Sequence, residues 1–558
     1  MISTVFSLIT VQNAEYAVVT LGVYVIISAN IYVYAVLMYL QITFLCIYRV
    51  YFHPLSSFPG PLSYKISGWP LLWQAYIGNR HICHLLDHQK YGPVVRISPN
   101  ALSFNTASAL HTIYAPRNAN VKKGEWYKTF DIAAGTYSSF TETSKDKHAA
   151  KRRWMGPIFS PESLNANEQT VRGIVERFCE TLRSFRQDCK EESNADWGEK
   201  WNASELSTYL GFDIMGALVF GSSFETVQKE MFRPLASSVL PASMLMYWIS
   251  YLPPALIVRP ILRTRLFEAL GGKSVTDNNR LIDYGATQVQ LQQSKVKAER
   301  DSNSQRVDFL SHLVTAKDKK TDWHPSTADL GTESLNLMNA GADPFSGVLA
   351  GAIFYLVRNP DALRGVTQEI RSSFTSPSEI INGPVLNHCT YLYAVIEETL
   401  RRTAPVPSHL PRIVLDGGME IDGVHIPAGT TVGVPMYALH NDPTHFPAPF
   451  AFLPERWIES PSNPASSIVL ARRAFFPFSI GSRMCSGRNL AYLQLKLTLA
   501  HLLWRFDLRL APDEPESGGG KPGLGIGRER SDEFQMWDAL GFGRDGPMVQ
   551  VRIAQVES

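Results

Sequence analysis

The sequence predicts a mainly α-helical protein with a small β region, preceded by an N-terminal transmembrane helix. Three observations lead to this fold class: an uncharged segment at 16–48, an almost wholly apolar helical stretch at 329–359, and short alternating runs broken by glycine-containing turns near residue 420. Hydrophobic residues make up 45% of the 558 residues and charged residues 19%, so a large core is feasible. The 53 Lys and Arg nearly balance the 51 Asp and Glu, which argues against a nucleic-acid-binding protein.

The segment 16–48 has no charged residue and is longer than the roughly 20 residues that cross a bilayer. Glu15 precedes it and Arg49 follows it, and the positive flank of a membrane helix stays on the cytosolic side. We therefore expect a lumenal N-terminus at 1–15, a single transmembrane anchor at 16–48 and a cytosolic remainder. The alternative is a buried core helix, against which the length of the segment argues.

A proline-rich hinge is expected at 49–61, because the stretch HPLSSFPGP contains three prolines and should be stiff. The rest of the chain, 62–558, is expected to form the functional domain, and it contains no internal repeat.

Helices should dominate this domain. The stretch 329–359 is apolar on all sides, which is typical of a helix that runs through a core. Pro360 is a favoured residue for the first turn of the helix that follows. Short alternating runs at 412–435, with turn pairs such as Asp422-Gly423, predict a small sheet.

The glycine-rich composition of the tail at 512–533 predicts a loop. It lacks the Ser or Thr that follows the lysine of a phosphate-binding loop, so we assign it no nucleotide. No dinucleotide fingerprint occurs elsewhere, and any reducing electrons would have to come from a separate protein.

The cysteines are scattered and none forms a CxxC pair, which favours a reducing compartment and argues against a zinc ribbon. One of them has unusual neighbours, in the stretch FSIGSRMCSG at 478–487 just before an apolar helix. A helix N-terminus stabilises a thiolate, Gly481 allows a tight turn, and Arg483 can reach an anionic group. A lone thiolate beside an arginine suits an iron porphyrin, with sulfur on the metal and arginine on a propionate. The six cysteines are Cys46, Cys83, Cys179, Cys189, Cys389 and Cys485.

The pattern FxxGxRxCxG resembles the haem-binding signature of the cytochrome P450 haem-thiolate monooxygenases. Its five fixed positions are Phe478, Gly481, Arg483, Cys485 and Gly487. The resemblance extends from about Tyr51 to the C-terminus. It implies the cytochrome P450 fold and haem b (iron protoporphyrin IX) bound by a Cys485 thiolate, with Phe478, Gly481 and Arg483 in the cofactor-binding loop.

Two further groups of residues resemble family motifs. Glu398 and Arg401 in EETLRR, with Arg456 in FLPERW, match a buried Glu-Arg-Arg triad whose role in the family is structural. His148 and Arg152 are four residues apart in HAAKRRW and match the helix that holds the haem propionates; Arg412 in HLPRIV matches a further propionate partner. The alternative for each of these last three basic residues is a solvated surface charge.

The stretch AGADPFSG, at 340–347, departs from the family pattern. The family's acid is present as Asp343, but Pro344 occupies the position of the usual threonine, whose hydroxyl helps to deliver protons during oxygen activation. Proline donates no N–H, so the Ala340 carbonyl should lose its helical partner and the helix should bend. We expect Asp343, the Ala340 carbonyl and an ordered water to form the catalytic proton relay. The alternatives are a hydroxyl of the substrate, or an enzyme that does not activate dioxygen in the ordinary way.

The apolar stretch 240–258 favours a lipophilic substrate that arrives from the lipid bilayer, whether this stretch dips into the membrane surface or packs in the core. The stretch 121–147 matches the loop that lies over the haem in the family, and 240–258 matches the substrate-access helices. A basic surface near the cysteine loop could dock an acidic electron donor. Its candidates are Lys145, Lys147, Lys151, Arg153, Arg472, Arg473 and Arg488.

The sequence therefore predicts a membrane-anchored monooxygenase that hydroxylates or epoxidises a lipophilic small molecule with O₂. Similarity to fungal microsomal members implies secondary metabolite biosynthesis, a single-pass location in the endoplasmic reticulum membrane with a cytosolic catalytic domain, and NADPH-cytochrome P450 reductase as electron donor. A monomer with no nucleic-acid partner is expected. Two alternatives stay open: a haem-thiolate isomerase or dehydratase, favoured by Pro344, and a non-catalytic haem carrier or sensor.

Overall fold

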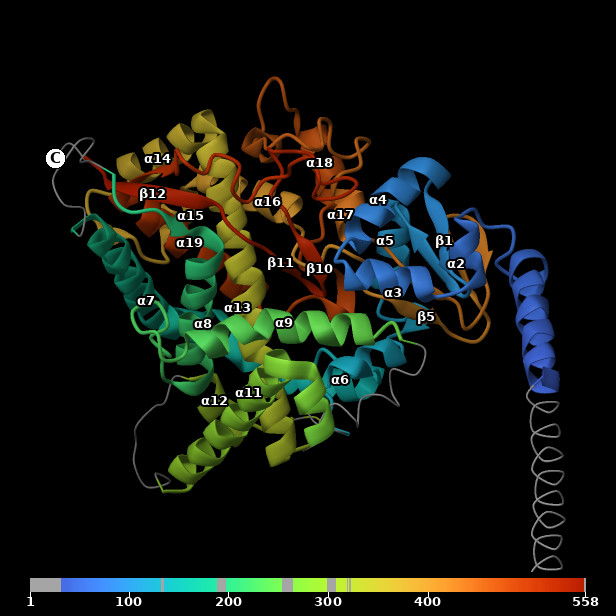
Figure 1. Ribbon diagram of the computed structural model, residues 1–558. Helices are drawn as coiled ribbons and strands as arrows, with labels where there is room; N and C mark the ends of the chain where they lie inside the picture. The colour runs from blue at the N-terminus through green and yellow to red at the C-terminus, as the bar shows by residue number, and fades with distance from the viewer. Residues whose placement is uncertain are drawn as a thin grey trace, which may run out of the picture.

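The computed structural model describes residues 32–131, 135–187, 197–252, 264–298, 308–318, 320 and 323–555. Within this part of the chain a large helical body carries several small sheets, which confirms the predicted fold class (Figure 1). The α-helices, in chain order, are α2 (Leu62–Ile66), α3 (Trp69–Tyr76), α4 (Arg80–Tyr91), α5 (Ala107–Tyr114), α6 (Lys145–Met155), α7 (Pro161–Gln187), α8 (Ala203–Phe220), α9 (Arg233–Ile249), α11 (Arg265–Ala298), α12 (Phe309–Thr315), α13 (Thr327–Arg358), α14 (Pro360–Ser373), α15 (Pro384–His388), α16 (Thr390–Arg402), α17 (Met436–His440), α18 (Ala465–Ala474) and α19 (Arg488–Arg505).

Helix α13 is the central element of the body, as the apolar stretch predicted. It begins at a capping box in which the Ser326 side chain accepts from the Asp329 N–H and the Asp329 side chain accepts from the Ser326 N–H. Figure 1 shows α13 passing through the middle of the molecule, and it packs against α8, α11, α16 and α19. The helix continues through Pro344 without interruption, and α14 begins at Pro360 as expected.

The strands form small sheets at the edges of the helical body. The largest has the order β1-β2-β8-β5-β3, in which β2 and β8 run parallel and the other neighbours antiparallel. The hairpin of β6 and β7 turns at Asp422 and Gly423, both with positive φ, which confirms the predicted turn. The strands of this region are β1 (Val94–Ser98), β2 (Ala101–Phe104), β3 (Val121–Lys122), β5 (Arg412–Val414), β6 (Met419–Ile421), β7 (Val424–Ile426) and β8 (Thr431–Gly433).

Two further sheets lie near the C-terminus. One has the order β4-β12-β9 and is antiparallel throughout. The other is the hairpin β10–β11, whose turn residue Leu540 has a φ of 77°. These strands are β4 (Trp201–Asn202), β9 (Phe506–Leu510), β10 (Trp537–Ala539), β11 (Gly541–Gly543) and β12 (Met548–Ile553).

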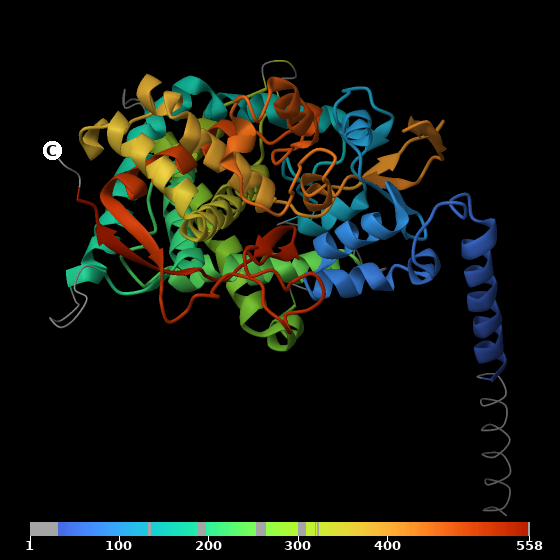
Figure 2. The same cartoon turned by 90° about the horizontal axis from the view of Figure 1, so that it is seen from above.

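The helix Tyr32–Phe52, whose last turn is the π-helix η1 (Tyr48–Phe52), stands away from the body in both views (Figures 1 and 2). Its most apolar stretch has a mean hydropathy of 1.6, and none of that stretch is buried. In α13, the other long apolar helix, 72% of the most apolar stretch is buried. An exposed apolar helix of this length fits a membrane anchor. The predicted lumenal segment and the first half of the predicted anchor lie outside the described residues.

The predicted hinge is packed onto the body. Leu55 is fully buried, and the Arg96 N–H donates to the Pro59 carbonyl at 2.7 Å. The Arg49 guanidinium donates to the Ile66 carbonyl, and Arg96 in turn donates to the Arg49 carbonyl. These contacts hold the base of the exposed helix against the folded domain.

Candidate active site

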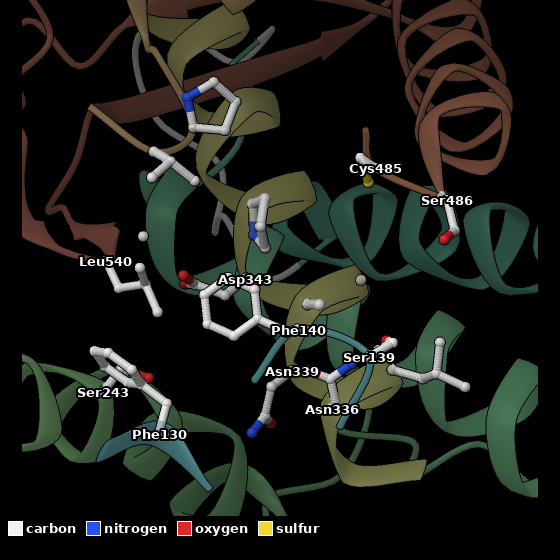
Figure 3. A pocket seen from close by; sticks show the side chains of 18 of the residues that line it. Phe130, Ser139, Phe140, Ser243, Asn336, Asn339, Asp343, Cys485, Ser486 and Leu540 are labelled. Atoms are coloured by element: carbon white, nitrogen blue, oxygen red, sulfur yellow. Dashed lines mark hydrogen bonds between the residues drawn. The ribbon is translucent and has the colours of Figure 1, made fainter. Parts of the chain in front are cut away.

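A cavity of about 730 Å³ lies in the middle of the body, which is the size of a small-molecule site. One wall is α13, and the cysteine loop forms another. The remaining walls include residues of α6, α9 and α11, the segments 123–131 and 135–140, and the tip of the β10–β11 hairpin. Figure 3 shows Cys485 and Ser486 on one side of this cavity and Phe130 and Ser243 on the opposite side.

The cysteine loop is held by its own backbone. The Cys485 N–H donates to the Phe478 carbonyl at 2.9 Å, and the Phe478 ring packs on Tyr492 with a centroid separation of 5.4 Å. Helix α19 begins at Arg488, so the thiol lies before the helix rather than in its first turn. Phe478 and Cys485 both line the cavity.

The Cys485 thiol is exposed only toward the cavity and is enclosed by protein elsewhere. Burial raises its pKa, and the Gly487 backbone N–H and the Arg152 guanidinium offset only part of that shift. A metal bound to the sulfur would remove the proton outright.

Gly481 is required by the shape of this loop. Its φ is +73°, and a Cβ there would lie 2.1 Å from the Tyr114 carbonyl oxygen. We expect Gly481→Ala to lower the free energy of unfolding by more than the roughly 1–2 kcal/mol of a left-handed residue, because a backbone overlap adds to that cost. Gly429→Ala is the matched control, since Gly429 has a φ of +79° with no atom within 4 Å. Equal losses in urea unfolding of the two variants would contradict this expectation.

A cluster of cationic side chains lies at one end of the cavity. His148, Arg152 and Arg483, expected from the sequence, all line it, and so does Lys123, which the sequence analysis did not single out. Burial and the neighbouring Arg412 lower the pKa of Arg483 to about 10. Burial and the cations around it, Arg483 first, lower the pKa of His148 to about 2. Burial and the arginines also lower the pKa of Lys123 well below its usual value.

Arg152 and Arg483 line the cavity, and neither forms an ion pair with a carboxylate in the part of the chain that the structure describes. Arg483 donates to backbone carbonyls of Glu142, Thr143 and Ser144, and Arg152 donates to the Met484 carbonyl and the Ser486 hydroxyl. Such a cluster fits a ligand with more than one carboxylate.

Arg412 lies next to this cluster but is not part of the cavity wall. It is buried, and its guanidinium donates to the Tyr127 hydroxyl at 2.7 Å and to the Pro411 carbonyl at 3.0 Å. Tyr127 belongs to the loop that borders the cavity, and Arg412 would have to change partners to reach a ligand.

Glu398, Arg401 and Arg456 form one buried ion-pair group. The Arg401 guanidinium donates to both Glu398 carboxylate oxygens, at 2.8 and 2.9 Å, and Arg456 Nε lies 3.6 Å from Glu398 Oε1. The Leu453 N–H and the Trp457 indole N–H also donate to this carboxylate. Burial alone would raise the pKa of Glu398, but the two arginines and these donors hold it below its usual value.

The acid on α13 has a partner that the sequence did not reveal. Asp343 Oδ1 accepts from Arg544 Nη1 at 2.8 Å, and Arg544 Nη2 donates to the Thr208 hydroxyl. Arg544 follows β11 and is 201 residues away along the chain. Ala340, Asp343 and Pro344 line the cavity, whereas the Ser346 hydroxyl donates to the Ala342 carbonyl and lies outside it. No sequence signal marked Arg544, because only the fold brings it to α13.

Part of the predicted basic surface is neutralised. The Arg153 guanidinium makes two hydrogen bonds to the Asp318 carboxylate, the buried Lys151 pairs with Asp329, and Arg472 pairs with the buried Glu397. The prediction was wrong for these three residues, because acidic groups distant in sequence lie beside them. Lys145, Lys147, Arg473 and Arg488 stay exposed.

A mainly helical body, a lone cysteine sulfur facing its central cavity and arginines without a carboxylate partner at the cavity's end are the features expected of a haem-thiolate protein. The cytochrome P450 family model matches residues 62–529, so the chain belongs to the cytochrome P450 family. One relative of similar length is the cytochrome P450 monooxygenase fscF of Fusarium equiseti, which is 36% identical over 90% of this chain and 93% of the relative. The cytochrome P450 monooxygenase atnE of Emericella nidulans is 33% identical over 91% of this chain and 93% of the relative. The cytochrome P450 monooxygenase poxM of Penicillium oxalicum is 32% identical over 91% of this chain and 92% of the relative.

Membership of this family confirms the resemblance seen in the sequence and makes the chain a cytochrome P450 monooxygenase. The family carries haem with a thiolate ligand. The residues present fit that group: Cys485 is the one cysteine that lines the cavity in the described chain, and the cationic cluster is suited to a pair of propionates.

Proposed function

We propose that this protein is a membrane-anchored monooxygenase that hydroxylates or epoxidises a lipophilic small molecule in fungal secondary metabolism. Its N-terminal helix would anchor it in the endoplasmic reticulum membrane, with the catalytic domain in the cytosol. NADPH-cytochrome P450 reductase would supply the electrons. The observation that carries the proposal is the Cys485 sulfur facing a central cavity whose end is lined by Arg152 and Arg483, neither of which pairs with a carboxylate in the described part of the chain.

Cys485 would supply the iron ligand, and Arg483, Arg152 and His148 would hold the propionates. The haem, when bound, supplies the activation of dioxygen. Burial and the neighbouring cations keep the His148 imidazole uncharged, and its one N–H could donate to a propionate, whose negative charge would raise the pKa of His148. Arg412 would hold the Tyr127 hydroxyl rather than contact the propionates directly, unless it changes partners. The Glu398, Arg401 and Arg456 group would be structural.

The protein's own residues must also bring protons to the reaction. Pro344 leaves the Ala340 carbonyl without its helical donor at the cavity wall. Asp343 borders the same cavity and is held by Arg544, so its carboxylate has a fixed direction. We propose that an ordered water between the Ala340 carbonyl and Asp343 takes the place of the threonine hydroxyl.

Lys145, Lys147, Arg473 and Arg488 are the exposed cations that we propose as the docking surface for an acidic electron donor. Lys145 and Lys147 lie in the first turn of α6, Arg473 lies in the last turn of α18, and Arg488 begins α19 directly after the cysteine loop. Electrons would then enter on the side of the molecule where Cys485 holds the iron.

The experiment that tests the proposed function is reconstitution with reductase, NADPH and a lipophilic candidate substrate. Consumption of NADPH linked to an oxygenated product is the expected result. Turnover of an organic peroxide without reductase or NADPH would instead support a haem-thiolate isomerase or dehydratase, which Pro344 and the adjacent Phe345 favour as the second candidate. Haem binding with neither reaction would support a carrier or sensor.

The Pro344→Thr variant tests the proton relay. Threonine returns an N–H to the Ala340 carbonyl and adds a hydroxyl, so the water site is lost and the share of NADPH that ends as hydrogen peroxide should change by about two- to tenfold. Peroxide and product are measured per NADPH consumed. Ser346→Ala is the control, because that hydroxyl is bonded to the Ala342 carbonyl and should leave the ratio unchanged. If Pro344→Thr leaves peroxide and product yields unchanged, the water relay has no support.

A further inference from the structure

Helix α3, with the sequence WPLLWQAY, has no charged residue and presents large apolar side chains on two opposite faces. One face packs on the body, where Leu71 and Ala75 are buried. The other face carries Trp69, Trp73 and Tyr76, whose exposed fractions are 61%, 61% and 59%. Spacings of four and three residues place these three rings along one side of the helix. A helix that is apolar on opposite faces is normally covered on both, so the exposed face of α3 calls for an apolar partner.

The exposed face of α3 continues onto the elements that pack beside it. The Trp73 and Tyr76 rings stack with their centroids 5.7 Å apart. The Tyr76 ring also meets the half-buried Trp248 ring of α9 edge to face, with the centroids 6.1 Å apart. On α2, which packs against α3, the Leu62 side chain is exposed. Several large apolar side chains exposed together mark a contact surface rather than an ordinary solvated one.

The glycine-rich loop at 512–533 carries a further exposed apolar residue near the end of α3. Its Ile526 side chain is 77% exposed. The loop is tied to the turn that follows α3, since Arg528 donates to the Asn79 side-chain oxygen at 2.7 Å and to the Gly78 carbonyl at 3.2 Å. The loop therefore holds an isoleucine in solvent close to the exposed rings.

The position and composition of this surface indicate a lipid membrane as its partner rather than a second copy of the chain. Helix α2 packs against both α3 and η1, the last turn of the exposed apolar helix, and Figure 1 shows α2 and α3 on the side of the body next to that helix. Tryptophan and tyrosine are the side chains enriched where a membrane meets water. The segment 49–86 contains no Asp or Glu, so none of its side chains would repel lipid phosphates.

We propose that α3 lies in the interfacial layer of the membrane that the N-terminal helix enters, with Trp69, Trp73 and Tyr76 among the lipid headgroups and Ile526 at the edge of the contact. The catalytic domain would then bind the bilayer directly and not only through its anchor. The proposal rests on the membrane anchoring in the proposed function. It adds a second attachment that is fixed relative to the cavity, since α3 packs against the cavity wall α9.

Quenching of tryptophan fluorescence by brominated phospholipids tests the proposal in the full-length, haem-loaded protein. The first of the 11 tryptophans is Trp69, so the N-terminal helix has none and quenching reports the folded domain alone. The protein is incorporated into phosphatidylcholine–phosphatidylserine vesicles, with or without bromine on the upper part of the acyl chains, and vesicle flotation measures incorporation. Bromine should lower the emission by about a fifth, the share of two tryptophans among 11 that emit equally. Trp69→Phe/Trp73→Phe should lose most of this quenching.

Trp197→Phe/Trp504→Phe is the matched control, because it also removes two tryptophans but leaves α3 unchanged. The Trp197 ring contacts the guanidinium groups of Arg509 in β9 and Arg552 in β12, and the Trp504 indole donates to the Phe374 carbonyl at 3.0 Å. This variant should keep the quenching of the wild-type protein. None of these measurements needs reductase, NADPH or turnover.

The proposal is overturned if bromine does not quench the wild-type protein in vesicles that it has entered, or if Trp69→Phe/Trp73→Phe keeps the wild-type quenching. If quenching is absent and the protein in detergent is a dimer that Trp69→Ser/Trp73→Ser separates, the exposed face of α3 joins two copies of the chain instead. Flotation without quenching would contradict this proposal alone. A protein that does not float with the vesicles would contradict both this proposal and the proposed anchor.

Discussion

A Cys485→Ala variant is expected to lose all NADPH-dependent product formation. Alanine offers no ligand atom, so the iron would have no bond to the protein on the side where the sulfur faces the cavity. The cationic cluster would still attract the propionates, and some haem should therefore remain with altered absorption. Product formed with reductase and the haem content of the purified protein are the two measurements.

Cys389→Ala is the matched control for that variant. The Cys389 side chain is buried in the core, and its sulfur donates to the Val385 carbonyl at 3.5 Å, away from the cavity. The variant should keep its haem and its turnover. Undiminished product formation by Cys485→Ala would show that another residue holds the iron.

An Arg401→Ala variant is expected to have the largest effect on stability, a loss of about 3–5 kcal/mol in the free energy of unfolding. The Arg401 side chain is completely buried, and besides Glu398 it donates to the carbonyls of His440, Pro449 and Ala451. Its removal leaves Glu398 with only the more distant Arg456 as a cation and leaves three carbonyls without that donor. Urea unfolding of the purified protein, followed by tryptophan fluorescence, measures the change.

Arg364→Ala is the control for Arg401→Ala. Arg364 pairs with Asp361 on the surface, where both side chains are mostly exposed, and such pairs contribute little. Arg401→Lys keeps the charge but cannot reproduce the forked geometry, so it should fall between the two. Arg401→Ala with the stability of Arg364→Ala would contradict a structural role for the triad.

Much of the fold could be predicted because it depends on local patterns. The all-round apolar character of 329–359 identified the core helix, Pro360 marked the start of α14, and the Asp422-Gly423 pair identified the β6–β7 turn. Each is a property of adjacent residues. The contacts of the hinge were not predictable, since they depend on where β1 lies in the folded protein.

The candidate site likewise combines residues that a local motif identifies with residues that only the fold brings together. A short motif marked Cys485, and its neighbours in the motif line the cavity with it. The pairing of Asp343 with Arg544, the cation Lys123 and the neutralised Lys151 arise from segments far apart in sequence.

The absorption spectrum of the ferrous protein under carbon monoxide tests the central claim most directly. A bond between the Cys485 sulfur and the haem iron predicts the long-wavelength Soret band of a thiolate-ligated complex, and predicts its loss in Cys485→Ala. A wild-type protein with the shorter-wavelength band of a nitrogen-ligated haem, or with no haem at all, would contradict the account.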